Sequence, residues 1–354
     1  MALLRGLLVI AAVSVALIGL IKSDLLSLDE EIGLLDHPAS GPLDRRHLAL
    51  IINAADPLSE ALAAAYQAQR RIPASQVIRV RLPSARSSLS PAEFTAIKAD
   101  VDRRTPDHVQ AFALAWATPY RVGCLSITTA FAFGYDPRHC AQGCLSTLPN
   151  PYFAKPAVRR PWDELRIRPS MLLAASSLAQ GQRLIERGVA ADGTAPPGTG
   201  YLLSTTDAAR NVRAARFEQA KLALAPILKV VVLRADALRN ANDVMFYFTG
   251  LSVVEALDTL RFRPGAIADH LTSFGGQLTD SSQMSALRWL EAGATGSYGT
   301  VVEPCNIPAK FPDPGLVMLF YRRGDTLIEA YWRSVAMPGQ GVFIGEPLAS
   351  PWRP

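Results

Sequence analysis

The sequence predicts an α/β protein with a mostly parallel sheet flanked by helices. Two observations support this prediction. Strand-like apolar runs alternate with helical segments along the chain, and several of these runs are apolar throughout, which is typical of strands buried on both faces. With 354 residues, of which 49% are hydrophobic, the chain can build one large domain with a sizeable core. No repeat or change of composition marks a second domain, so we expect a single α/β domain over residues 47–354.

The first part of this domain has a β-α-β-α-β order. Its strands are expected at residues 47–53, 76–82 and 108–118. Asp56 followed by Pro57 predicts the start of a helix that runs to about Arg71. Ser90 and Glu93 form a capping box that opens a second helix. This alternation favours a parallel sheet covered by helices.

The remaining elements continue the same alternation. Further strands are expected at residues 171–175, 201–204, 227–234 and 244–249, with helices at residues 177–188, 207–224, 315–322 and 325–335, and residues 342–348 form a closing segment. The central stretch, 263–306, predicts a strand, a glycine turn, a helix over residues 281–292 and a second strand over residues 294–302. Such a unit makes two neighbouring parallel strands joined by a right-handed crossover.

Reactive side chains follow both strands of this central stretch. Asp269 and His270 come at the end of the first strand, and Glu303 and Cys305 follow the second. Because the carboxyl ends of parallel strands lie at one edge of a sheet, these side chains are expected to converge there, where open α/β sheets bind ligands. Tyr120 and Arg121 follow an earlier strand and are expected at the same edge, where Arg121 either binds a substrate carboxylate or pairs with Glu303 or Asp269.

Residues 134–162 interrupt the alternation. This segment is rich in Pro, Gly and Cys and is too long for an ordinary connection. We interpret it as a loop excursion at the ligand edge, a candidate lid or substrate rim, with a plain surface loop as the alternative.

The N-terminus favours export. Residues 1–22 are predicted to be a signal peptide or an N-terminal membrane anchor, because 16 almost wholly apolar residues, Gly6–Ile21, follow Arg5. Residues 23–46 are expected to be a polar tether. We expect a periplasmic protein. Unless the N-terminal segment is cleaved, it anchors the protein to the inner membrane, and no other part of the chain is expected to contact a membrane.

Four cysteines fit an oxidising compartment. An even number predicts two disulfides, and the short spacing favours Cys140 with Cys144, leaving Cys124 with Cys305. The competing hypothesis keeps Cys305 free as a nucleophile, with His270 as its base and Asp269 orienting the imidazole. The two hypotheses exclude each other, because a bridged sulfur is not a nucleophile.

Other site classes have weaker support. Asp269, His270 and Glu303 could hold a cation, but a turn capped by Asp269 and a structural hydrogen bond from His270 explain them better, so no metal site is predicted. The glycine-rich stretch 293–300, which contains the candidate binding residue Ser297, lacks the Gly-Lys-Ser/Thr end of a phosphate loop, and its glycines more plausibly allow close strand packing. The formal net charge is +5, but the basic residues are scattered. We therefore expect no nucleic-acid partner and no cofactor.

From Asn53 onward, the chain resembles an uncharacterised family of bacterial exported proteins, and the matching sequence stretches cover nearly the whole mature chain. They include NAADPLS, AWATPYRV, CAQGC, RPGAIADHLTSFGG, EAGATGSYGTVVEPCN and MPGQGVFIGEP. The RRIP turn before the second strand and the closing strand pairs are more remotely similar to the gingipain-like cysteine peptidases, which implies a caspase-like fold. In that superfamily a Gly-His-Gly follows one strand and a catalytic Cys ends the next. Here residues 249–252 are Thr-Gly-Leu-Ser and residues 269–272 are Asp-His-Leu-Thr, so the usual dyad is missing.

These observations give two functional hypotheses. The first is an exported peptidase-like domain that lacks the usual Cys/His dyad and binds a peptide or an envelope component at the carboxyl edge of the sheet, with Tyr120, Arg121, Ser297 and Glu303 as binding residues. The second is an active cysteine hydrolase that uses Cys305 and His270. Whether the protein is an enzyme depends on the state of Cys305.

Overall fold

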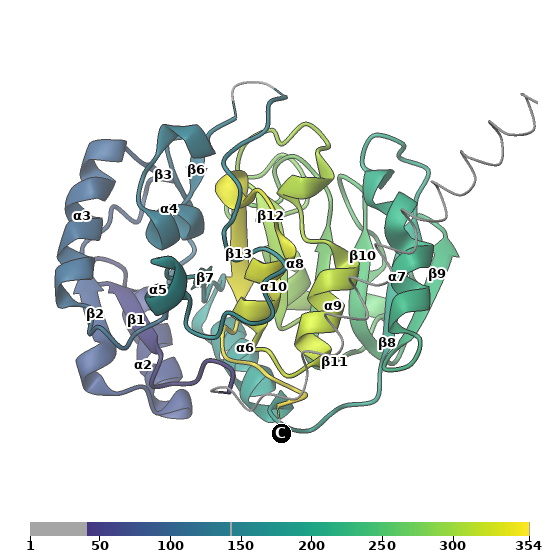
Figure 1. The fold of residues 1–354 in the computed structure, drawn as a ribbon, viewed down its shortest axis with the longest axis horizontal. Coiled ribbons are helices and arrows are strands. Elements are labelled where there is room, and N and C mark those ends of the chain that lie inside the picture. Colours follow the sequence, from purple (N-terminus) through teal and green to yellow (C-terminus); the bar gives the residue numbers. More distant parts are fainter. Residues whose placement is uncertain (1–40, 142–143, 354) are drawn as a thin grey trace, which may run out of the picture. The chain divides into compact units, whose positions relative to one another are not determined.

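A ten-stranded sheet forms the middle layer of the structure (Figure 1). The computed structural model describes residues 41–141 and 144–353. Across the sheet the strands follow the order β2-β1-β4-β7-β13-β12-β11-β10-β8-β9. They are β1 (Leu48–Asn53), β2 (Val77–Val80), β4 (Ala111–Leu114), β7 (Ser170–Leu172), β8 (Thr199–Ser204), β9 (Lys229–Arg234), β10 (Val244–Thr249), β11 (Phe262–His270), β12 (Gly296–Thr300) and β13 (Gly341–Gly345). A small second sheet contains β3 (Ser88–Leu89), β5 (Arg121–Val122) and β6 (Leu125–Ser126).

Most strand pairings in the large sheet are parallel, as the sequence predicts. Strand β1 lies between β2 and β4, β7 follows β4, and β11, β10, β8 and β9 form a second parallel run. Strands β11 and β12 are parallel neighbours, which confirms the predicted pairing of these two strands. Strand β13 is antiparallel to β12 and bridges β7 at one pair of residues, Ile344 and Leu172.

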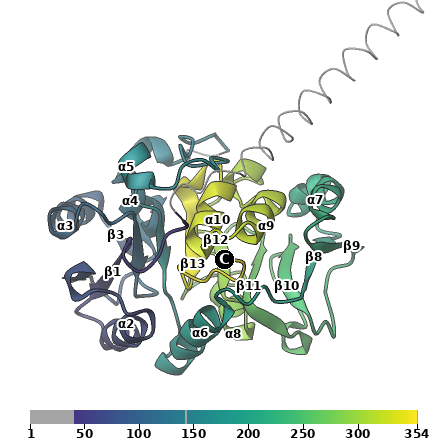
Figure 2. The same ribbon diagram turned by 60° about the horizontal axis from the view of Figure 1, so that its bottom comes forward.

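Helices cover both faces of the sheet. They are α2 (Pro57–Arg70), α3 (Pro91–Arg104), α4 (Ile127–Phe133), α5 (Pro161–Leu165), α6 (Leu178–Ala191), α7 (Phe217–Leu224), α8 (Leu287–Ala292), α9 (Pro314–Arg322) and α10 (Leu327–Ser334). The 3-10 helices are η2 (Ala74–Gln76), η3 (Pro137–His139), η4 (Asn211–Arg216), η5 (Leu257–Thr259), η6 (Pro308–Lys310) and η7 (Pro338–Gln340). Figure 2 shows α4, α10, α9 and α7 along one face and α2, α6 and α8 along the other. The fold is therefore the α/β type that the sequence predicts.

The predicted start signals act locally as expected. The Asp56 side chain accepts a hydrogen bond from Leu58 N at the start of α2, and Pro57 occupies the first turn. Ser90 and Glu93 make the complete capping box of α3. Helix α6 continues past Gly188, where the sequence predicts its end. A Cβ on Gly188 would lie 2.5 Å from Glu346 Oε2, so this glycine makes room for a side chain rather than capping a helix.

Two predicted helices are shorter than expected. The helix predicted over residues 281–292 is only α8, because the Ser281 and Ser285 hydroxyls bond back to Phe274 O and Leu278 O and hold that segment as a loop. The helix predicted over residues 207–224 divides into η4 and α7. Both differences lie beside the carboxyl end of the sheet.

The core confirms the prediction that strands with apolar residues throughout are buried on both faces. Strands β1 and β10 are buried at every residue, as expected for strands covered by helices on both faces. Aromatic side chains fill the layer under α10, where the Trp332 and Phe343 rings stack with centroids 4.6 Å apart.

The compact unit of the chain is Pro42–Pro354. Leu43 is fully buried, and its N–H donates to Glu329 Oε2 at 3.1 Å, so residues 42–46 of the predicted tether belong to this unit. Residues 1–40, which include the predicted signal or anchor, lie outside the described residues. Within the described part of the chain, none of the helices has the length and apolar character to cross a membrane.

Candidate functional site at the carboxyl edge of the sheet

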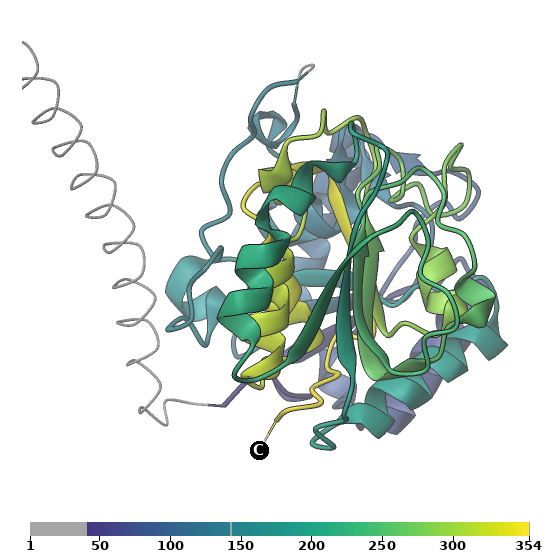
Figure 3. The same ribbon diagram turned by 90° about the vertical axis from the view of Figure 1, so that its right-hand side faces the viewer.

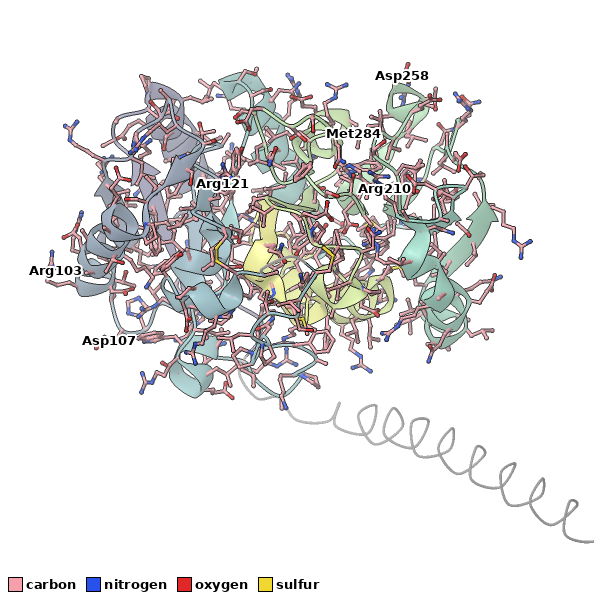
Figure 4. All side chains as sticks on the ribbon, turned by 90° about the horizontal axis from the view of Figure 1, so that it is seen from above. Arg103, Asp107, Arg121, Arg210, Asp258 and Met284 are labelled. Carbon is pink, nitrogen blue, oxygen red and sulfur yellow. A yellow bond between two sulfur atoms is a disulfide. The ribbon has the colours of Figure 1, made fainter. Side chains whose placement is uncertain are left out.

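The loops that follow β4, β11 and β12 meet at one end of the sheet, which we call the rim. The Tyr120 hydroxyl, after β4, donates to Asp280 Oδ1, after β11, at 2.5 Å. Thr300, at the end of β12, donates its hydroxyl to Thr272 O at 2.9 Å. Figure 4 looks onto this end of the molecule, with Arg121, Met284 and Arg210 spread across it. The convergence of strand-end loops that the sequence predicts is therefore present.

Glycines bring the rim loops into direct backbone contact. Gly276 N donates to Thr300 O at 2.9 Å, and a Cβ on Gly299 would lie 2.3 Å from the carbonyl carbon of Gly275. No side chain fits there, because a real Cβ does not approach backbone atoms so closely. The glycine-rich strand thus serves close packing, as expected from its lack of a phosphate-loop ending.

His270 is held as a buried neutral imidazole. Trp289 Nε1–H donates to His270 Nδ1 at 2.9 Å, so that nitrogen must be unprotonated, and Nε2–H then donates to Met284 O at 3.1 Å. Burial, with the Arg213 charge adding to it, lowers the pKa of His270 to about 3. The one lone pair that could accept a proton is already bonded to Trp289, so His270 is not available as a general base.

Asp269 points away from His270. The two are consecutive residues of β11, and consecutive side chains of a strand lie on opposite faces of the sheet. Asp269 makes a buried ion pair, with 2.7 Å between its Oδ1 and Arg213 Nη1. Burial raises the pKa of Asp269, and Arg213 opposes that change. Asp269 therefore cannot orient the imidazole, as the hydrolase hypothesis requires.

The predicted disulfide pairing is wrong. Cys124 bonds to Cys140, and Cys144 bonds to Cys305. The described residues contain no free cysteine. The neighbours Cys140 and Cys144 face different rim loops, so each pairs with a distant partner and not with the other. Cys305 is a bridged sulfur, and the structure does not support it as a thiol nucleophile.

The loop excursion, 134–162, is only partly a rim element. Its two cysteines fasten it at the rim, next to the β5–β6 hairpin and to the loop after β12. Beyond them the segment leaves the rim and runs along α10. There Asn150 Nδ2 donates to Trp332 O at 2.7 Å, and Ala154 N donates to Arg333 O at 3.0 Å. The part beyond Asn150 is therefore structural and not a lid.

Tyr120 and Arg121 lie at the rim, as predicted. Burial, together with the hydrogen bond to Asp280, raises the pKa of Tyr120 to about 12, so its hydroxyl stays protonated. Arg121 is half-buried, and its buried Nε has no hydrogen-bond partner. Neither of the ion pairs expected from the sequence forms, because Asp269 binds Arg213 and Glu303 Oε1 accepts Cys305 N at 2.8 Å. Among the described residues, the Arg121 guanidinium makes no ion pair or hydrogen bond.

The other predicted binding residues are placed differently. Glu303 is exposed at the rim, but Ser297 is fully buried inside β12, where its hydroxyl has no hydrogen-bond partner in the described part of the chain. Ser297 therefore cannot touch a ligand at the rim. Lys310 is fully buried behind the rim, and its Nζ has no hydrogen-bond partner among the described residues. Desolvation lowers the pKa of Lys310, and the charge of Glu303 opposes that change. Within the described ranges, no cluster of His, Cys, Asp and Glu could hold a metal ion.

Sequence reasoning missed the arginines that η4 brings to this end of the sheet. Arg213 pairs with Asp269, and Arg210 Nε donates to Thr272 Oγ1 at 3.2 Å while its Nη1 pairs with Asp207. They lie far from residues 263–306 in the sequence and inside a segment predicted to be one regular helix. The sequence contained only an indirect indication of Arg213: the carboxylate of Asp269 lies at the end of a buried strand, and a buried carboxylate requires a cation or hydrogen-bond donor as its partner.

Comparisons with known proteins give little further information. No protein-family model matches the chain, and no curated protein matches it. A solved structure described as "Structure of Protease" is similar, with a TM-score of 0.45 and 11% sequence identity, over 87% of this chain and 79% of that chain. At that level of similarity, the function has to be argued from the rim itself.

Proposed function

We propose that the protein is a peptide-binding domain, and that the rim binds the carboxylate of a peptide through Arg121. The observation that carries the proposal is the state of this side chain. Arg121 is a half-exposed arginine at the rim, and it makes no ion pair or hydrogen bond within the described part of the chain. The other described rim arginines differ, since Arg210 pairs with Asp207 and Arg138 with Asp136. A guanidinium with free donors suits a carboxylate, which it can bind through two parallel hydrogen bonds.

Binding without hydrolysis fits the state of the two residues proposed for catalysis. The sulfur of Cys305 is bonded to Cys144, and both nitrogens of His270 are occupied in a buried site. A cysteine hydrolase needs a thiolate next to an imidazole that can accept its proton, and neither group is in that state. A domain that binds a peptide and does not cleave it is consistent with this arrangement.

The surroundings of Arg121 would add selectivity. The hydrogen bond from Tyr120 to Asp280 fixes a polar wall beside the guanidinium, and the charge of Arg121 acts on the Tyr120 hydroxyl. Leu145 follows Cys144, which a disulfide fastens to the loop after β12, and 62% of its surface is exposed, so we propose it as an apolar contact for the ligand elsewhere on the rim. We therefore infer a ligand with a carboxylate close to an apolar side chain, such as the C-terminal end of a peptide.

The cellular setting of the proposal is the periplasm. Two disulfides are consistent with an exported protein, because thiols in the cytoplasm are kept reduced. We propose export with the N-terminal segment as a signal or an inner-membrane anchor, so that the ligand is a peptide or an envelope protein. Fractionation of cells that express the tagged full chain tests this, and a tag recovered only from the cytoplasm would contradict it.

The binding proposal can be tested with peptides that differ only at the carboxylate. Fluorescein-labelled hexapeptides of random composition would be titrated with free C-termini and, separately, amidated. We expect Arg121→Gln to weaken binding of the free-carboxylate pool at least about tenfold, because a charge-assisted hydrogen bond contributes about 1.5–3 kcal/mol. Arg138→Gln, which alters a paired and 74% exposed arginine on the same rim, is the control and should change binding less than about twofold. No binding by the wild type, equal binding of both pools, or no effect of Arg121→Gln would refute the proposal.

A further inference from the structure

Strand β9 is the last strand of the large sheet, and one side of it is open. It lies at the right-hand end in Figure 1 and faces the viewer in Figure 3. All six of its residues, Lys229–Arg234, are in parallel register with β8. On its other side, no described residue makes a backbone hydrogen bond to it. The outward amide and carbonyl groups of β9 are therefore free to pair with another strand.

The other edge of the sheet, strand β2, is less accessible to a further strand. Strand β2 has only four residues, and Arg104 Nη1 donates to Arg79 O on it at 2.9 Å. The Arg79 side chain is in turn paired with Glu60 at 3.0 Å. A strand of four residues, one of whose carbonyl groups is already bonded by a side chain, is a poor template for a further strand. The two edges of the sheet thus differ in their capacity to accept a partner.

The side chains of β9 define what could pair with it. Val231, Val232 and Leu233 are half-buried and apolar, whereas Lys229 and Arg234 at the two ends are exposed. Neither end residue makes an ion pair within 4.0 Å among the described residues, because the nearby carboxylates pair with other cations; the charge of Lys229 acts only at longer range on Asp243 and helps to lower its pKa. Just before β9, Leu222 on α7 has 73% of its surface exposed and Ile227 has 38%. The edge is therefore apolar in the middle and positive at both ends.

We propose that the β9 edge binds an extended peptide segment of another protein as an added strand, and that this segment carries acidic residues on both sides of an apolar centre. Backbone pairing supplies the affinity of such strand addition, and the side chains supply its selectivity. The charge pattern argues against a second copy of this chain. Antiparallel pairing of two β9 strands around a two-fold axis would place Lys229 opposite Arg234 of the other copy, and like charges directly opposite each other are destabilising. This site is separate from the rim and does not depend on Arg121.

The probe is a fluorescein-labelled, C-terminally amidated peptide, Glu-Val-Thr-Val-Thr-Glu, compared with Lys-Val-Thr-Val-Thr-Lys. Amidation removes the terminal carboxylate, so binding does not report on the rim. With the full chain, we expect the acidic probe to bind and to slow amide hydrogen exchange within residues 229–234. Its binding should weaken as ionic strength rises, because the end charges are exposed.

Charge reversal at the strand ends tests the specificity. In the variant Lys229→Glu with Arg234→Glu, we expect binding of the acidic probe to fall at least about tenfold and binding of the basic probe to rise. The control is Arg81→Glu with Arg103→Glu near the closed β2 edge, which should change binding less than about twofold. Three outcomes would overturn the proposal: no binding of the acidic probe, binding without protection of residues 229–234, or unchanged binding after charge reversal. Dimers that form without the probe and protect β9 would assign the edge to a second copy and overturn it as well.

Discussion

Replacing Arg213 by methionine should destabilise the domain strongly, because it removes the cation that faces a buried carboxylate. Asp269 has 1% of its side chain exposed and Arg213 has 4%, and their ion-pair distance is 2.7 Å. Removing one partner of a buried pair typically costs about 3–5 kcal/mol. Arg213 also donates to Thr249 O at 2.8 Å and to Pro312 O at 3.3 Å.

The two carbonyl groups that accept a hydrogen bond from Arg213 are affected differently by this substitution. Thr249 O keeps a hydrogen bond from Leu271 N at 2.9 Å, whereas Pro312 O loses the Arg213 donor, which adds about 1 kcal/mol. We therefore expect Arg213→Met to lower the free energy of unfolding by about 4–6 kcal/mol, measured by urea titration followed by circular dichroism. Adding Asp269→Asn removes the buried charge without changing the side-chain volume and should restore at least about 2 kcal/mol. The control is the exposed pair of Arg239 and Glu255, where Arg239→Met should cost less than about 0.5 kcal/mol.

The loss in Arg213→Met should depend on pH with a defined sign. Burial raises the pKa of Asp269, and the variant lacks the cation that opposes this change. A carboxyl group with a raised pKa in the folded state favours folding most below its unfolded pKa of about 3.9, and stability falls as pH rises through the folded value. The destabilisation should therefore be smaller at pH 5 than at pH 8. A cost below about 1 kcal/mol, or an equal cost at both pH values, would refute the role given to this pair.

Three further predictions concern stability. Burial lowers the pKa of His270 to about 3, so the neutral imidazole stabilises the fold fully above the unfolded pKa of about 6.5, and this stabilisation is lost as pH falls toward the folded pKa. Between pH 6.5 and pH 5, the free energy of unfolding of the wild type should fall by about 2 kcal/mol more than that of His270→Gln in urea titrations. Equal falls in the two proteins would contradict this. Gly299→Ala should cost at least about 3 kcal/mol in thermal unfolding, because its Cβ would lie 2.3 Å from backbone atoms; an equally stable Gly299→Ala would show that the rim backbone can move. Loop entropy predicts that Cys144→Ser with Cys305→Ser, which opens a span of 161 residues, lowers the free energy of unfolding by about 5 kcal/mol. Cys124→Ser with Cys140→Ser opens a span of 16 residues and should lower it by only about 3 kcal/mol. If urea titrations gave the reverse order, they would contradict the pairing.

Much of the fold follows from short-range signals in the sequence. The runs LALIIN and VMFYFT are apolar throughout and become the fully buried strands β1 and β10. The capping residues Asp56 and Ser90 start α2 and α3 as predicted. The same signals fail where side chains bond to distant loops. Ser281 and Ser285 lie in a helical pattern, but their hydroxyls bond to backbone carbonyls seven residues earlier, so the helix starts later.

The candidate site was only partly predictable. Its location at the carboxyl edge follows from the parallel order of the strands, but side-chain directions there depend on where each strand ends. Strand β11 continues through His270, so Asp269 and His270 lie on opposite faces and cannot work together. The disulfide pairing depends on which loops face each other at the rim, which spacing within the CAQGC string does not reveal. Tertiary contacts likewise decide that Asp269 pairs with Arg213 and that Arg121 has no partner among the described residues.

A disulfide map of the protein recovered from its native compartment tests the central claim most directly, namely that the rim binds without a thiol nucleophile. The protein would be alkylated and digested without reduction, and its cross-linked peptides identified by mass. We predict one pair that joins Cys124 to Cys140 and another that joins Cys144 to Cys305. A free Cys305 that is alkylated faster than in the denatured protein would contradict the account and make a cysteine hydrolase the better explanation.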